Sequence, residues 1–129
     1  MITIKSSREI ELMRDTCSLA KSTLEFIEPF VKPGVSTLEI NDLCHDFIVK
    51  NGAVPSPLNY HGFPKSICSS INNVICHGIP NKKSVLCDGD IINIDITTFL
   101  NNFHGDTSKT FLIGNVRDDV RKLVDITYL

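Results

Sequence analysis

The fold of this chain is decided by residues 90–113, which read DIINIDITTFLNNFHGDTSKTFLI. Successive side chains of a β-strand point to opposite faces, so the isoleucines at positions 92, 94 and 96 share one face and Asp95 lies on the other. Asn101-Asn102 interrupts the pattern, and Asn tolerates the positive φ that a two-residue hairpin turn requires. We therefore predict an antiparallel hairpin of residues 90–100 and 103–113, with one apolar and one polar face.

The polar face of the predicted hairpin carries two aspartates. If Leu100 pairs with Phe103, Thr97 lies opposite Asp106, and Asp95 and Asp106 become diagonal neighbours, roughly 7–8 Å apart at the backbone. Converging, partly buried carboxylates repel each other unless one is protonated or a cation lies between them. A divalent metal, or a bridged pair of metals, would relieve the repulsion and activate a bound water. Spacing alone leaves a second interpretation open, in which both residues are ordinary acids at a strand edge or turn.

Two helices are predicted before the strands. Each begins with a capping box, in which a Ser hydroxyl and a Glu carboxylate three residues later satisfy each other's backbone amides. The boxes are Ser6 with Glu9 and Ser36 with Glu39, and the two helices should run antiparallel. The first helix has an apolar stripe that we expect to face the core, formed by Ile10, Met13, Cys17, Ala20, Leu24 and Ile27.

The remaining segments alternate between loop, strand and helix. Residues 55–64 contain three prolines and a glycine, which predicts a loop. Residues 66–71 and 74–77 are rich in strand-forming residues and are predicted as strands. A further helix is predicted from Asp118, and the residues that usually end a helix do not follow it.

Composition narrows the class of protein. The 129 residues are 42% hydrophobic and 22% charged, which is typical of one globular domain. A formal net charge of -2 gives no basic excess for direct binding of nucleic acid. We recognise no signal peptide and no apolar run of membrane-spanning length, so we expect a cytoplasmic location and no membrane partner. The five cysteines are odd in number and widely spaced, which predicts small buried hydrophobes rather than disulfides.

Four runs together resemble the bacterial type I methionine aminopeptidase family, in order and at matching spacing. They are YHGFPKSICSSIN at 60–72, VICHGIP at 74–80, DGDIINID at 88–95 and HGDTSKTF at 104–111. The resemblance also includes both N-terminal helices and so covers essentially the whole chain. It implies an α/β (α+β) architecture, namely half of a pita-bread fold, in which helices lie outside a curved antiparallel sheet.

The resemblance also implies an activity. The family removes the initiator methionine from nascent proteins, near the ribosome, with two divalent metal ions per complete site, whether cobalt, manganese, iron or zinc. By this resemblance Asp95 is a bidentate metal ligand and Asp106 the bridging ligand. His77 is a weak signal by itself, but the resemblance makes it the histidine that contacts substrate and steadies the transition state.

The pocket for the methionine side chain follows from the same resemblance. Tyr60, Phe63 and Cys68 match its lining, and a thioether suits such a soft, aromatic site. Pro57 and Phe63 depart from the Cys and Tyr that are common in the family, so the shape of the pocket is expected to differ.

Members of the family continue for roughly another complete half, which supplies one histidine and two glutamate ligands and a second catalytic histidine. We therefore expect residues 1–129 to be the N-terminal half of the catalytic domain, with weak metal affinity and no activity alone. The isoleucine face and the last helix should lose packing partners, so the isolated chain should self-associate. Two alternatives stay open. One is a non-catalytic pita-bread relative that binds a partner or peptide, and the other is an inactive truncated remnant.

Overall fold

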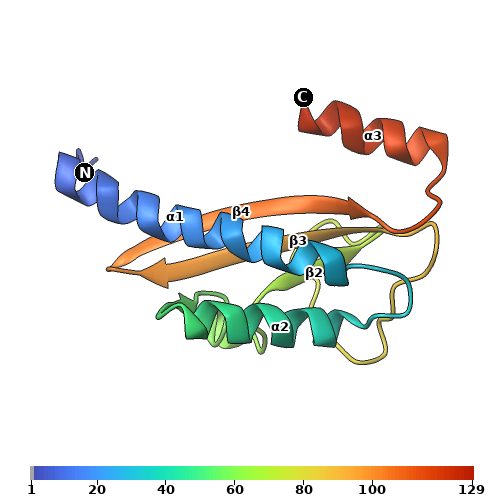
Figure 1. Cartoon of the computed structure of the whole chain (residues 1–129), viewed down its shortest axis with the longest axis horizontal. Helices are drawn as coiled ribbons and strands as arrows, with labels where there is room; N and C mark the ends of the chain where they lie inside the picture. The colour runs from blue at the N-terminus through green and yellow to red at the C-terminus, as the bar shows by residue number, and fades with distance from the viewer. Residues whose placement is uncertain (1) are drawn as a thin grey trace.

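The computed structural model describes residues 2–129 as helices packed on an antiparallel sheet (Figure 1). Its helices are α1 (Ser7–Ile27), α2 (Thr37–Lys50) and α3 (Asp118–Tyr128), with short 3-10 turns at Glu28–Phe30 and Tyr60–Gly62. Its strands are β1 (Val54–Pro55), β2 (Cys68–Ile71), β3 (Ile91–Leu100) and β4 (Phe103–Leu112). The long strand β3 is central, because β4 pairs along one edge while β1 and β2 pair with opposite ends of the other edge.

The predicted hairpin is confirmed in its register and its turn. Leu100 pairs with Phe103, Thr97 with Asp106, and Asp95 with Ser108. Asn101 and Asn102 have φ values of 56° and 67°, as expected for a two-residue turn in which both residues are left-handed.

The apolar face of the hairpin forms the centre of the core. Ile92, Ile94 and Ile96 are fully buried, so the expectation that this face would lose its packing partners is wrong. The reason is that α1 lies across the hairpin and α2 runs beside α1 in the opposite direction (Figure 1). Burial of each such side chain contributes about 1.5–3 kcal/mol. The core also contains Ala20, Leu24, Ile27, Ile40, Cys44, Ile48, Ala53, Ile67, Leu86, Phe111 and Ile113.

A close backbone approach fixes α1 against the hairpin. A Cβ atom placed on Gly105 would lie 2.5 Å from the carbonyl carbon and oxygen of Thr16. The buried hydroxyls of Thr16 and Thr98 lie 3.0 Å apart, and that of Thr98 also donates to the Thr16 carbonyl. Only glycine allows this contact. Because α1 covers this face of the hairpin, the opposite face, which carries the aspartates, points away from the helices.

The two capping boxes are confirmed, but the apolar stripe on α1 is only partly correct. Ser6 and Ser36 each receive the backbone N–H of the Glu three residues later, and each Glu carboxylate accepts from the Ser. The buried face of α1 begins at Thr16, whereas Ile10 and Cys17 are exposed. The first turns of α1 extend beyond the turn of the hairpin, so no sheet lies beneath them (Figure 1).

Two strand predictions need correction. Residues 74–77 are irregular, with a bend at Cys76, rather than a strand, because the chain turns at residues 72–73, where the Val74 N–H donates to the Ile71 carbonyl, and His77 is left-handed at φ 56°. The strand predicted at 66–71 is confirmed only from Cys68 onward. The short strand β1 includes Pro55, where a loop was predicted. Pro55 lies opposite Thr98 near the end of β3, and proline is tolerated in such a short edge strand.

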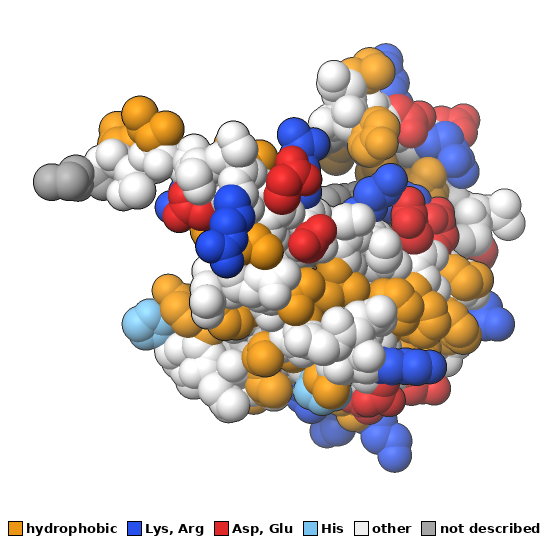
Figure 2. Space-filling view, turned by 60° about the vertical axis from the view of Figure 1, so that its left-hand side comes forward, with side chains coloured by type: hydrophobic (Ala, Val, Ile, Leu, Met, Phe, Trp, Pro, Cys, Tyr) orange, Lys and Arg blue, Asp and Glu red, His pale blue; other side chains and the backbone are white. Residues whose placement is uncertain are grey.

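The cysteine prediction is correct for two of five residues. Cys44 and Cys68 are buried, and burial raises the pKa of Cys44 to about 12. The exposed cysteines are Cys17, Cys76 and Cys87, and all five are free thiols. None of the helices within residues 2–129 combines the length and apolar character that a membrane span needs. On the face shown in Figure 2, acidic and basic side chains are interspersed and form no extended basic patch.

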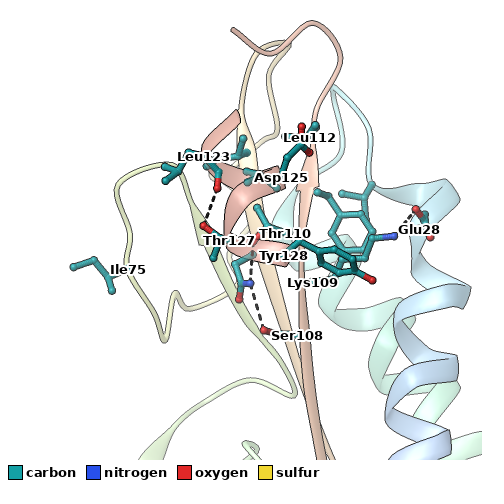
Figure 3. Close-up of a pocket in the computed structure, with 15 residues that line it drawn as sticks. Glu28, Ile75, Ser108, Lys109, Thr110, Leu112, Leu123, Asp125, Thr127 and Tyr128 are labelled. Carbon is teal, nitrogen blue, oxygen red and sulfur yellow. Dashed lines mark hydrogen bonds and ion pairs between the residues drawn. The ribbon is translucent and has the colours of Figure 1, made fainter. Parts of the chain in front are cut away.

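The last helix lacks packing partners, as predicted. No residue of α3 is buried, and Leu123 and Ile126 are 62% and 58% exposed. A groove of about 1340 Å³ separates α3 from the sheet. Figure 3 shows residues that line this groove, among them Leu123 and Tyr128 of α3 and Ser108 and Thr110 of β4.

Candidate metal and substrate site

The polar face of the hairpin brings two carboxylates together. Asp95 on β3 is half-buried, and Asp106 on β4 lies diagonally beside it on the same face. Thr97, directly opposite Asp106, donates a 3.2 Å hydrogen bond from its hydroxyl to Asp106 Oδ1. The predicted convergence of the two aspartates is confirmed.

Convergence changes the protonation of Asp95. Burial, the negative charge of Asp106 and hydrogen bonding with that carboxyl together raise the pKa of Asp95 to about 6, against an opposing contribution from His77. Two neighbouring carboxylates repel each other when both are ionised, and a positive charge between them favours the ionised form of both. A cation between them would replace the proton and relieve the repulsion.

The backbone of β2 positions His77 near these acids. The Ser69 N–H donates to the Gly78 carbonyl at 2.8 Å, and the Gly78 N–H donates to Ser70 Oγ at 3.2 Å. A Cβ atom on Gly78 would lie 2.0 Å from the Ser69 carbonyl oxygen, so a larger residue would push the loop away. His77 is exposed in this loop, and its charge lowers the pKa of Asp95.

The loop of residues 57–63 presents two aromatic side chains. Asn59 donates its N–H to the Phe63 carbonyl at 2.8 Å, and Tyr60 donates to the Pro57 carbonyl at 3.0 Å, which closes the loop on itself. Three of its residues, Asn59, His61 and Gly62, have positive φ. Tyr60 is 69% exposed, while Phe63 is half-buried.

Cys68 lies on the floor between the loop and the aspartates. It is paired with Asp95 across β2 and β3 and is 8% exposed. Burial first, and then the negative charges of Asp95, Cys76 and Asp106, raise its pKa to about 11. The thiol therefore stays protonated at neutral pH, which suits an apolar pocket wall better than a metal ligand or nucleophile.

All six residues selected from the sequence line one cavity of about 720 Å³. The cavity is formed between the polar face of the hairpin, the loop 57–63 and the segment after His77. The six are Tyr60, Phe63, Cys68, His77, Asp95 and Asp106.

A hydrogen-bonded pair in the cavity was missed in the sequence. Ser56 Oγ lies 2.8 Å from His104 Nδ1, and both residues line the cavity. Strand alternation could have found His104, because positions 104 and 106 share a face. No local signal marks Ser56, which reaches the site only through the pairing of β1 with β3.

The donor set fits part of a metal site. Carboxylate oxygens are suitable donors for divalent cations, and Asp95 and Asp106 provide them at one point. Within residues 2–129, no group of three or more His, Cys, Asp or Glu side chains is arranged to hold a metal ion. Among the described residues, the two carboxylates therefore converge without a third such side chain placed to complete a metal site.

Comparison with known proteins agrees with the resemblance. The chain is 50% identical over 127 residues to the methionine aminopeptidase of Rickettsia prowazekii. The aligned region covers 98% of this chain and 49% of that protein. It is 55% identical over 114 residues to the Escherichia coli K12 methionine aminopeptidase, covering 88% and 43% respectively. The chain thus spans about half the length of the curated relatives it matches.

The solved structures place the fold. The crystal structure of the Rickettsia prowazekii methionine aminopeptidase matches with a TM-score of 0.97 at 51% identity, over 99% of this chain and 51% of that one. This match confirms the predicted half of a pita-bread fold. Residues 11–129 match metallopeptidase family M24, and since they make up nearly the whole chain, this protein belongs to that family.

Proposed function

We propose that the complete polypeptide carrying this chain is a metal-dependent methionine aminopeptidase that removes the initiator methionine from nascent proteins. The observation that carries the proposal is the convergence of Asp95 and Asp106 at a cavity that His77 and an aromatic loop also line. A non-catalytic binding module would not need two converging carboxylates, one of which has its pKa raised by burial and by the charge of the other.

We assign the metal-binding role to Asp95 and Asp106, which would hold divalent ions, two per complete site. Their oxygen donors and their affinity for positive charge support this assignment. Bound metal would polarise the peptide carbonyl and provide an activated water. Thr97 supports the arrangement, because its hydrogen bond to Asp106 Oδ1 holds one carboxylate oxygen in place.

We assign substrate contacts to the other side of the cavity. His77 would donate a hydrogen bond to the substrate carbonyl and to the oxyanion that forms from it. Tyr60, Phe63 and Cys68 would surround the methionine side chain, whose sulfur makes favourable contacts with aromatic rings of about 0.3–1.5 kcal/mol. Pro57, beside them, adds a rigid apolar wall in this chain.

The partners follow from this activity. The substrate is the N-terminal methionine of a nascent chain, which places the enzyme in the cytoplasm near the ribosome, without direct contact to nucleic acid or membrane. We propose that residues 1–129 are the N-terminal half of the catalytic domain. The remaining half would supply the further ligands, so residues 1–129 alone would be an inactive fragment.

Two variants of the complete polypeptide test the roles. Asp106→Asn should abolish both turnover of Met-Ala-Ser and metal binding, because it removes a metal ligand. His77→Ala should lower turnover by about 10²–10³-fold while metal content stays near that of the wild type, because His77 contacts only substrate. Metal content is measured by mass spectrometry beside the peptidase assay. Equal loss of metal in both variants would contradict the assignment of metal binding to Asp106 and of substrate contact to His77.

A further inference from the structure

We propose that Ser56 and His104 form a positioning pair that holds the loop 57–63 against the metal-binding strands, and so sets the affinity for the methionine side chain. The proposal rests on the proposed function. Ser56 Oγ lies 2.8 Å from His104 Nδ1, and both side chains line the cavity. Since a hydroxyl both donates and accepts, the bond forms with either histidine tautomer.

The loop 57–63 depends on such an anchor because its own hydrogen bonds are local. Within residues 2–129, they join the loop to itself or to Pro55, just before it in the chain. The segment also contains Asn59 and His61 at φ 68° and 46°, a conformation that costs free energy and persists only where the surroundings enforce it.

Ser56 supplies the connection to both strands of the site. Its N–H donates to the Thr97 carbonyl of β3 at 2.9 Å, and its hydroxyl bonds His104 of β4. The His104 ring is held in turn against Phe99, the residue opposite it, with centroids 4.7 Å apart. One residue before the loop is therefore tied to the two strands that carry Asp95 and Asp106.

The consequence is a preformed wall for the substrate side chain. If the pair is broken, the loop samples other positions, and substrate binding must restore the correct one. This cost applies equally to the bound substrate and the transition state, so KM rises while kcat is retained. Loss of one hydrogen bond predicts an increase of about three- to tenfold.

The test uses the complete polypeptide and two independent measurements. Ser56→Ala should accelerate hydrogen exchange at the Asn59 and Phe63 amides by about three- to tenfold and raise KM for Met-Ala-Ser by a similar factor, with metal content and kcat within twofold of the wild type. Ser56→Thr, which keeps a hydroxyl, should restore both values. His104→Ala should act like Ser56→Ala, and the double variant should be no worse than either single one.

A matched control is Ser84→Ala, which removes a 2.8 Å side-chain hydrogen bond with Asn81 in a loop outside the cavity. It should change neither the exchange of the loop 57–63 nor KM. Unchanged exchange in Ser56→Ala, fast exchange with a wild-type KM, or additive effects in the double variant would overturn the positioning role. A wild-type polypeptide without Met-peptide turnover would instead refute the proposed function, and the exchange rates would still decide whether the pair holds the loop.

Discussion

Replacement of Asp95 by Asn should stabilise the metal-free chain at neutral pH. The pKa of Asp95 is raised from an ordinary 3.8 to about 6, first by burial and then by the charge of Asp106. A carboxyl whose pKa is higher in the folded state than in the unfolded state destabilises the fold whenever it is ionised. The amide of Asn removes that charge with little change in shape.

The expected gain follows from the difference between the two pKa values. At about 1.4 kcal/mol per pKa unit, the difference corresponds to about 3 kcal/mol. Asp95 is only half-buried and solvent screens its charge, so we expect about 1–2 kcal/mol in the free energy of unfolding. The destabilisation by Asp95 is full above pH 6 and disappears as the pH falls toward 4, because the proton then neutralises the group in both states.

Urea unfolding followed by far-ultraviolet circular dichroism measures this difference with EDTA present. Asp95→Asn should unfold at a higher urea concentration than the wild type at pH 7.5, and the two should converge only as the pH falls below about 4. Asp15→Asn, at an exposed position of α1, is the matched control and should shift stability by less than about 0.5 kcal/mol. A stabilisation of Asp95→Asn that did not change with pH, or a loss of stability at pH 7.5, would refute the electrostatic reasoning.

Three further outcomes are expected. Gly105→Ala should lower the free energy of unfolding by about 2–4 kcal/mol in urea titrations, because its Cβ would meet the Thr16 backbone at 2.5 Å; a loss below 1 kcal/mol would show that α1 can shift. Gly78→Ala should reduce turnover of the complete polypeptide by about tenfold or more with metal retained, since its Cβ would displace the loop that positions His77; full activity would contradict that positioning. Residues 1–129 alone should show no metal-dependent hydrolysis of Met-peptides, weak metal binding by calorimetry, and self-association by light scattering through the exposed apolar side chains of α3; an active, monodisperse monomer that binds metal tightly would contradict all three expectations.

Local sequence signals predicted the elements that local physics controls. The hairpin register followed from strand alternation and the Asn101-Asn102 turn, and both helix starts followed from their capping boxes. Because register determines which side chains share a face, the convergence of Asp95 and Asp106 could also be predicted from their spacing. The interpretation of the two aspartates as a metal site depended on the resemblance, since two acids on one face of a hairpin have other ordinary explanations.

Local signals failed where burial depends on partners distant in sequence. Cys17 has the right helical spacing but lies exposed on α1, whereas the neighbouring Thr16 is buried because Thr98 and Gly105 meet it from the hairpin. Residues 74–77 have strand-forming side chains, yet the hydrogen bond to the β2 backbone is made by the Gly78 carbonyl, which accepts from the Ser69 N–H.

The sequence by itself therefore determined the hairpin, the helix starts and the two carboxylates, because their geometry repeats over a few residues. The tertiary structure alone decided that helices cover the isoleucine face and that Ser56 meets His104 across 48 positions of the chain. The physical reason is that these contacts form between segments that are distant in the chain and that the folded core brings together. The local periodicity of the sequence does not indicate which distant segments will meet.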